Sequence, residues 1–333
     1  MAVQPHQPAP SRDTVAEIGQ YLAPELRKVE AILQGIVDSD SQMIREVGEY
    51  IALTSGKKLR PMLNLLATRA FNPTGEVSVQ IAAAMELVHV ATLLHDDVID
   101  KAQIRRGQQS VNARWGDDVA ILMADYLYSA AFELLLENLV APPLRMVCKV
   151  TRRMCEGEMF QIERRGAWLT SEDYLHICSC KTGWLFSACA ALGGELAHLE
   201  SDHVARLAAF GMDFGLAFQI TDDTLDYTAQ SESWGKAVGS DLAAGKQTLP
   251  LILTLQHADE DEAAELRRAL GEGGDPEIIH RAMARHRAIE RSLDVARRYS
   301  SQSVEHLAPL EVRDPVAYEY LVMLPEYVID RQY

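Results

Sequence analysis

"IAAAMELVHVATLLHDDVID", residues 81–100, is the stretch that decides the fold of this chain. Its apolar residues recur at spacings of three and four, which is typical of a helix that is buried on most of its surface. The carboxylates of Asp96, Asp97 and Asp100 lie within this apolar pattern. Buried like charges disfavour one another unless a cation compensates them. We therefore interpret this segment as a buried helix whose acidic end binds positive charge.

The acidic pattern occurs a second time, in "AFQITDDTLDY" at residues 217–227. Its three carboxylates belong to Asp222, Asp223 and Asp226, which repeat the D-D-x-x-D spacing of the first motif. Residues four apart lie on one face of a helix, about 5.4 Å apart along the axis. His89, two turns before the first motif, and Gln219, one turn before the second, extend each polar stripe.

The type of ligand atom indicates which ion these motifs bind. Carboxylate oxygens without cysteine or clustered histidine suit a hard cation. Mg²⁺ is usually held by one or two carboxylates, with substrate phosphates completing its coordination shell. Two such clusters therefore predict Mg²⁺ and a phosphate-rich ligand between them.

Basic residues flank both acidic motifs, as a phosphate-rich ligand requires. "SGKKLRP" at residues 55–61 opens another helix, whose free N–H groups favour an anion. "DKAQIRRGQ" at residues 100–108 follows the first motif, and "GKAVGSDLAAGKQTLP" at residues 235–250 follows the second. Each cluster alone is typical of solvated surface. Their position beside two acidic motifs favours a diphosphate site.

The bulk properties exclude several classes of protein. The 333 residues, 48% of them hydrophobic, are enough for a large core, and the net charge of −16 argues against a nucleic-acid partner. The five cysteines form no C-x-x-C pair, so we expect neither a disulfide framework nor a zinc site. No apolar leader and no run of about 18 uncharged apolar residues is present, so we expect a soluble, cytoplasmic protein.

The helical spacing continues along almost the whole chain, whereas strand-like alternation is hard to find. Gly- and Pro-containing breakers separate helices of about 12 to 28 residues, and no linker divides the chain. We therefore predict an all-α protein, with a flexible tail at residues 1–12 and one helical domain over residues 13–333.

These ordered motifs resemble those of the trans-isoprenyl diphosphate synthases, or polyprenyl synthetases. The resemblance runs from "SGKKLRP" to "GKQTLP" and so covers most of the chain. It implies an isoprenoid synthase type I fold, a helical bundle around a central cavity. It also implies a homodimer that uses Mg²⁺, three ions in the substrate-bound state, to join isopentenyl diphosphate to an allylic diphosphate such as farnesyl diphosphate.

The resemblance assigns roles position by position. The magnesium contacts would be Asp96, Asp100 and Asp222, supported directly or through water by Asp97, Asp223 and Asp226. The allylic diphosphate would be bound by Arg105, Lys181, Thr182, Lys236 and Lys246. Isopentenyl diphosphate would be bound by Lys57, Arg60, His89 and Arg106. Gln219, with Thr182 nearby, would face the allylic cation.

Product length is predicted from the helix that precedes Asp96. In this family, an aromatic side chain four or five residues before the first motif closes the tunnel early. Here these positions hold small residues, and the deeper positions on the same face hold no aromatic residue either. The five positions are Ala91, Thr92, Val88, Met85 and Ala84. We therefore predict a medium- or long-chain product, of the kind used as a quinone side chain, and at most transient contact with a membrane.

Three alternatives stay open on the sequence. A geranylgeranyl or farnesyl diphosphate synthase would share every motif. A class I terpene cyclase would share the first motif, but it usually has a different second motif and no isopentenyl site. A non-catalytic subunit would normally lose one acidic cluster. Glu158 and Gln161 are as compatible with core or surface placement as with the allylic site, and we expect the C-terminal aromatics to serve packing or dimer contacts.

Overall fold

The computed structural model describes residues 14–53, 56–72, 76–137, 141–228, 240–243, 245–270 and 275–330. Lys236 and the predicted tail at residues 1–12 lie outside the described residues. Within the described ranges, regular structure is helical apart from one short hairpin, so the all-α prediction is confirmed.

The helices follow one another through short connections. Those of the first half are α1 (Thr14–Tyr21), α2 (Ala23–Val37), α3 (Gln42–Leu53), α4 (Leu59–Phe71), α5 (Glu76–Ile99), α6 (Val111–Trp115), α7 (Asp117–Glu137) and α8 (Ala141–Glu163). Those of the second half are α9 (Ser171–Cys178), the π-helical turn η1 (Ser179–Gly183), α10 (Trp184–Leu196), α11 (Ser201–Leu225), α12 (Ser240–Ala243), α13 (Leu249–His257), α14 (Glu260–Ala269), α15 (Pro276–Arg285), α16 (Ala288–Leu307) and α17 (Pro315–Asp330).

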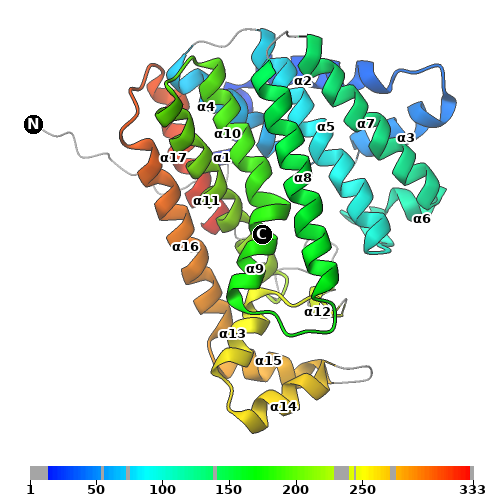
Figure 1. Cartoon of the computed structure of the whole chain (residues 1–333), viewed down its shortest axis with the longest axis vertical. Helices are drawn as coiled ribbons and strands as arrows, with labels where there is room; N and C mark the ends of the chain where they lie inside the picture. The colour runs from blue at the N-terminus through cyan, green and yellow to red at the C-terminus, as the bar shows by residue number, and fades with distance from the viewer. Residues whose placement is uncertain are drawn as a thin grey trace, which may run out of the picture.

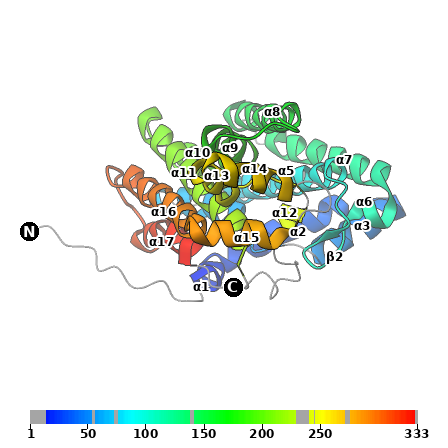
Figure 2. The ribbon, with the colours of Figure 1, turned by 90° about the horizontal axis from the view of Figure 1, so that it is seen from below.

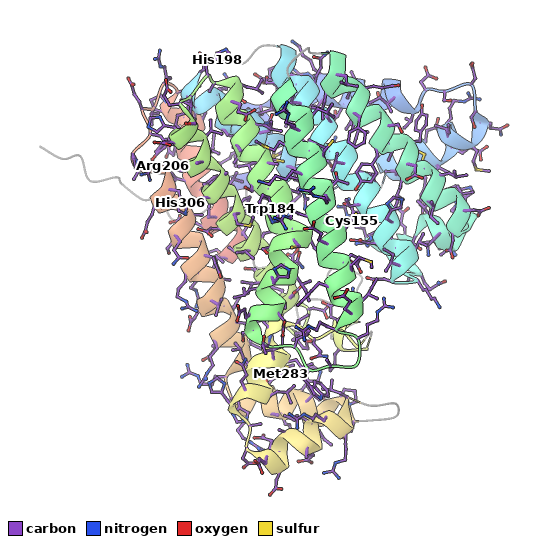
Figure 3. The ribbon with its side chains drawn as sticks, in the orientation of Figure 1. Cys155, Trp184, His198, Arg206, Met283 and His306 are labelled. Carbon is purple, nitrogen blue, oxygen red and sulfur yellow. The ribbon has the colours of Figure 1, made fainter. Side chains whose placement is uncertain are left out.

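The long helices stand side by side, and the three short helices α13, α14 and α15 gather at one end of them (Figure 1). The view from below shows these three helices in front of the bundle (Figure 2). Met283 lies in this lower group, where it belongs to a separate cluster of buried apolar residues, whereas Trp184 lies beside α8 in the main bundle (Figure 3).

Helix α5 forms the middle of the bundle because its sequence is apolar on nearly every side. Four consecutive residues, Ala82 to Met85, have no exposed surface. The helix packs against α4 on one side and α7 on another. By length and composition alone, the window Ser78–Ile99 could cross a membrane, but 72% of it is buried inside the protein. Its apolar character is therefore that of a core helix, which holds the first acidic motif at its C-terminal end.

Glycines bring α11 against the segment formed by η1 and α10. A Cβ atom on Gly215 would lie 2.8 Å from the Cα atom of Gly183, and one on Gly211 would lie 2.4 Å from the carbonyl oxygen of Phe186. Only residues without a side chain allow the backbones to approach this closely. This contact places η1 beside the end of α11 that carries the second acidic motif.

Candidate active site

The first acidic motif occupies the C-terminal end of α5, and its three carboxylates differ in environment. Asp97 is 3% exposed, Asp96 is half-buried and Asp100 is exposed. Burial raises the pKa of Asp96, while the positive charge of Lys181 opposes that rise. Desolvation therefore makes Asp96 a carboxylate whose charge is stabilised by a nearby cation.

Asp97 holds a β-hairpin in place behind the motif. Strand β1 (Ile104–Arg105) pairs antiparallel with β2 (Gln108–Gln109), and both turn residues, Arg106 and Gly107, have positive φ, as a type I′ turn requires. The Arg105 guanidinium donates to the Asp97 carboxylate, with Nε at 2.9 Å. In the described structure Asp97 therefore anchors the segment that presents the two arginines.

The second acidic motif, at the end of α11, is tied to the short helix α12. The backbone N–H of Asp241 donates to Asp226 Oδ2 at 2.8 Å, and Asp226 is only 6% exposed. The sequence analysis quoted the segment that contains Asp241 but assigned no role to it. Its signal was an acidic residue five positions before Lys246, inside an otherwise basic Gly-rich segment.

Lys246 links the two acidic motifs. Its Nζ lies 3.1 Å from Asp100 Oδ2, in the first motif, and 3.9 Å from Asp241 Oδ1, beside the second. Burial by itself lowers the pKa of Lys246, but the charges of Asp100 and Asp241 raise it above the ordinary value. The ammonium group therefore lies between the motifs, where the sequence analysis expected a cation and a diphosphate.

Lys181 reaches the first motif from η1. Its Nζ lies 2.5 Å from Glu158 Oε2 and 3.3 Å from Gln161 Oε1, both on α8. Burial lowers the pKa of Lys181, but the charges of Asp96 and Glu158 raise it overall. The sequence analysis left Glu158 and Gln161 undecided, and the structure places both in contact with a predicted site residue.

A chain of hydrogen bonds joins η1 to the second motif. Thr182 Oγ1 donates to Gln219 Oε1 at 2.8 Å, and Gln219 Nε2 donates to Asp223 Oδ1 at 2.7 Å. Tyr174, which the sequence analysis did not identify, donates its hydroxyl to Asp223 Oδ2 at 2.7 Å. Burial, reinforced by the charge of Asp241, raises the pKa of Asp223 to about 7. The network fixes the Gln219 amide with its oxygen toward Thr182, as expected for a π turn that serves a functional site.

The predicted isopentenyl diphosphate residues meet on the opposite face of α5. Arg60 Nη1 lies 3.0 Å from His89 Nε2, and the Arg60 guanidinium lies 4.5 Å from the centre of the Phe186 ring. Burial, together with the charges of Arg60 and Arg106, lowers the pKa of His89 well below its ordinary value. His89 is therefore neutral and accepts the hydrogen bond from Arg60.

A buried carboxylate balances this basic cluster. Glu86 is 5% exposed and lines one cleft together with His89, Arg105 and Arg106. Burial lowers the pKa of Arg60, and the charge of Glu86 is the largest influence opposing that shift. The sequence analysis missed Glu86, although it stands one turn before His89 on the same helix face.

Two further contacts complete the basic half. A Cβ on Gly56 would lie 2.8 Å from Arg106 Nη2, so a side chain there would displace the guanidinium. Lys57 Nζ donates to the Tyr327 hydroxyl of α17 at 2.7 Å. We expected packing or dimer contacts from the C-terminal aromatics. Tyr327 is packed, at 9% exposure, but it also contacts a predicted substrate-binding lysine.

The predicted chain-length residues all lie inside the bundle. Ala84, Met85, Val88 and Ala91 have no exposed surface, and Thr92 is 8% exposed. Thr92 Oγ1 donates to the His89 carbonyl at 2.7 Å, so its methyl group, not its hydroxyl, is available to line a channel. The face of α5 that precedes the acidic motif is therefore lined with small and flexible apolar groups.

The donor set fits Mg²⁺ bound together with a diphosphate. Among the described residues, no group of three or more His, Cys, Asp or Glu side chains lies close enough to hold an ion by itself. Mg²⁺ seldom uses such an all-protein cage and instead combines one or two carboxylates with water and substrate phosphates. Asp96, Asp100 and Asp222 supply oxygen ligands of this kind around a cleft that also holds lysine ammonium groups.

Comparison with known proteins gives one consistent result. The polyprenyl synthetase family model matches residues 41–285. Octaprenyl diphosphate synthase of Haemophilus influenzae is 32% identical over 325 residues, which cover 96% of this chain and 98% of that protein. Short chain isoprenyl diphosphate synthase of Methanothermobacter thermautotrophicus is 35% identical over 314 residues, 91% of this chain and 95% of that protein. The crystal structure of a Caulobacter crescentus polyprenyl synthase, complexed with calcium and isoprenyl diphosphate, superposes with a TM-score of 0.90 at 31% identity, covering 98% of this chain and 100% of that one.

Proposed function

The chain belongs to the polyprenyl synthetase family, and from this premise we propose that it is a Mg²⁺-dependent trans-prenyltransferase. It would condense isopentenyl diphosphate with an allylic diphosphate, such as farnesyl diphosphate, and extend the product to a medium or long polyprenyl chain for a quinone. One observation carries the proposal. Lys246 spans from Asp241, beside the second acidic motif, to Asp100 in the first, so both motifs face a single cleft.

The acidic half of the cleft would ionise the allylic substrate. Mg²⁺, when bound, neutralises the diphosphate and makes it a better leaving group. Lys181, Lys246 and Arg105 add fixed positive charge around the same group. Such preorganised charges lower the barrier because they stabilise the leaving diphosphate in the transition state. The Gln219 oxygen and the Thr182 hydroxyl would face the allylic cation, which must be kept from water.

The basic half would hold isopentenyl diphosphate. Arg60 and Arg106 present guanidinium groups, which suit bidentate binding of phosphate oxygens. Lys57, on the exposed side of the same cluster, adds a point charge. Neutral His89 offers no charge and instead orients Arg60 through its ring nitrogen. The double bond of isopentenyl diphosphate would then attack the cation, and loss of a proton would regenerate an allylic diphosphate.

Product length is proposed from the residues on α5. Ala91 and Thr92 leave no aromatic plug beside the first motif, which favours a long chain. The likeness to an octaprenyl diphosphate synthase supports this proposal. The likeness to a short chain isoprenyl diphosphate synthase favours the alternative, a product of twenty carbons or fewer.

The experiment that tests the function uses the purified protein with Mg²⁺, farnesyl diphosphate and labelled isopentenyl diphosphate. The products are dephosphorylated and sized by chromatography and mass spectrometry. A ladder that ends in a long chain supports both the reaction and the length. A stop at twenty carbons or fewer supports the reaction and overturns the length, and no incorporation contradicts catalysis by this chain alone.

The α5 face can be tested by closing it. Ala91→Phe or Thr92→Phe should shorten the product because a ring would occupy the space beside the first motif. Product length is measured by mass spectrometry at equal conversion. Leu122→Phe, an exposed position on α7, is the control and should leave the length unchanged. An unchanged length in both α5 variants would place the growing chain elsewhere.

We also propose a homodimer that uses the outer face of α7. The window Asp117–Leu136 is as apolar as a membrane-spanning helix, but only 33% of it is buried. Leu122 is 68% exposed and Leu136 58% exposed, which is unusual for large apolar side chains on a free surface. Light scattering should give twice the chain mass, and Leu122→Glu should reduce it toward the monomer. A monomeric parent protein would refute the dimer.

A further inference from the structure

Gln247 forms a two-point hydrogen bond to the connection between α8 and α9. The backbone N–H of Leu169 donates to Gln247 Oε1 at 2.9 Å, and Gln247 Nε2 donates to the carbonyl of Ala167 at 2.8 Å. One side chain therefore satisfies a donor and an acceptor on either side of Trp168. Of the side chains of this length, only an amide has both functions.

Gln247 directly follows Lys246, the residue that bridges the two acidic motifs. The Lys246 backbone N–H donates to the Asp241 carbonyl at 2.8 Å, and Gly245 before it has a φ of +70°, which closes a turn that favours glycine. The backbone at Lys246 is thus fixed on its N-terminal side by this turn. On its C-terminal side, the next side-chain contact is the one that Gln247 makes.

The connection that Gln247 contacts also leads to the second lysine of the allylic half. Helix α8 ends four residues before Ala167, and its last two turns carry Glu158 and Gln161, which hold Lys181. Gln247 therefore ties the segment that positions Lys246 to the segment that positions Lys181. The two lysines come from parts of the chain about 65 residues apart, and this hydrogen-bonded contact joins their supports.

We propose that Gln247 is a positioning residue for the allylic diphosphate. It acts through the backbone of Lys246, holding the ammonium group in register with Lys181 and Asp100 so that both lysines bind the same diphosphate. The inference rests on the proposed role of Lys246. A loss of the Gln247 contact weakens binding of the allylic substrate and leaves the isopentenyl site, which lies on the other side of α5, unaffected.

The local fold does not depend on this contact. Thr170 and Asp173 form a reciprocal capping box at the start of α9, and Arg164 pairs with Asp173 at 3.4 Å. Ser171 Oγ donates to Gln256 Oε1 of α13 at 3.2 Å. These contacts keep the α8–α9 connection on the protein when Gln247 is replaced. Gln256 also provides a matched control, since it joins the same two regions without touching the backbone of Lys246.

The test compares initial rates of Gln247→Met, which keeps the length of the side chain but forms neither hydrogen bond, with those of Gln256→Met. Gln247→Met should raise KM for farnesyl diphosphate about three- to tenfold, as expected for the loss of two neutral hydrogen bonds, with KM for isopentenyl diphosphate unchanged. Gln247→Glu keeps only the acceptor for Leu169 and should not restore the parent KM. Gln256→Met should leave both KM values at those of the parent.

A double-mutant cycle with Lys246→Ala separates this inference from the proposed function. If Gln247 acts through Lys246, Gln247→Met should have no further effect in the Lys246→Ala background. Additive effects would overturn the inference, as would an unchanged KM in Gln247→Met alone when Lys246→Ala raises it. An unchanged KM in Lys246→Ala would instead contradict the proposed role of Lys246 and, with it, the inference. A shared rise in both KM values would show a general structural effect and would also overturn it.

Discussion

The acidic and basic halves of the site solve the same electrostatic problem in different ways. In the acidic half, the charges of Asp96 and Asp100 are balanced by Lys181 and Lys246, long side chains that come from other parts of the chain. In the basic half, Arg60 is balanced by Glu86, which is buried on the central helix α5 itself. The acidic half can therefore exchange its partners for Mg²⁺ and diphosphate, whereas the basic half is preformed and keeps its counter-charge.

The largest expected effect breaks the acidic half. Asp96→Ala or Asp222→Ala should lower turnover by about three orders of magnitude, since metal-assisted charge stabilisation contributes several kcal/mol to such a reaction. The measurement is the steady-state rate of condensation, with circular dichroism as the check on folding. The midpoint of thermal unfolding of Asp96→Ala should not fall, because burial already disfavours this carboxylate. Parent-like rates in both variants would contradict the metal assignment.

The next effect concerns the counter-charge of the basic half. Glu86→Gln should lower the free energy of unfolding by about 2–4 kcal/mol, because it leaves the buried Arg60 charge unpaired. Added pyrophosphate should recover part of this loss by binding the folded state. Urea unfolding with and without pyrophosphate measures both quantities.

Glu195 on α10 provides the control for this change. Burial alone raises the pKa of Glu195, with no charged partner contributing, so Glu195→Gln should be neutral or stabilising. Equal losses of stability in the two variants would show that Glu86 has no special relation to the arginines.

A smaller effect is expected where the basic half meets α17. Tyr327→Phe removes the hydroxyl that accepts from Lys57 but keeps the ring, so KM for isopentenyl diphosphate should rise about two- to fivefold. Initial-rate kinetics at saturating farnesyl diphosphate measures this change. Tyr320→Phe, on the same helix and packed against the Tyr21 ring, is the control and should leave KM unchanged. A rise in both would point to a general effect on α17.

The smallest effect is a pH dependence of stability. Because the folded protein lowers the pKa of His89, the unfolded chain takes up its proton near pH 6.5 while the folded protein does not. The contribution of His89 is therefore complete above pH 6.5 and is lost as the pH falls below it. His89→Gln should flatten the decline of the urea midpoint between pH 7.5 and 5.5. A decline as steep as that of the parent, or an equal flattening by exposed His198→Gln, would contradict this assignment.

The sequence predicted the helical fold and the two acidic motifs because both depend on short, regular spacings. The pairing of Arg105 with Asp97 could not be predicted, since it requires the turn at Arg106 and Gly107. Glu86 was visible one turn before His89, but nothing in the spacing says which helix face meets the arginines. Tyr327 could not be assigned, because its partner Lys57 is 270 residues earlier and the contact arises only when α17 packs against α4.

The π-helical turn η1 makes the site sensitive to the length of the chain as well as to its composition. A π turn holds one residue more than an α-helical turn would in the same place. Removing one residue, such as Ser179, would let α9 continue into α10 as a regular helix. Every residue on the α9 side would then rotate by about 100° relative to those on the α10 side. A single deletion, which changes no charge, would thus separate the supports of Lys181 and Thr182 from Gln219, although each of these residues would still be present.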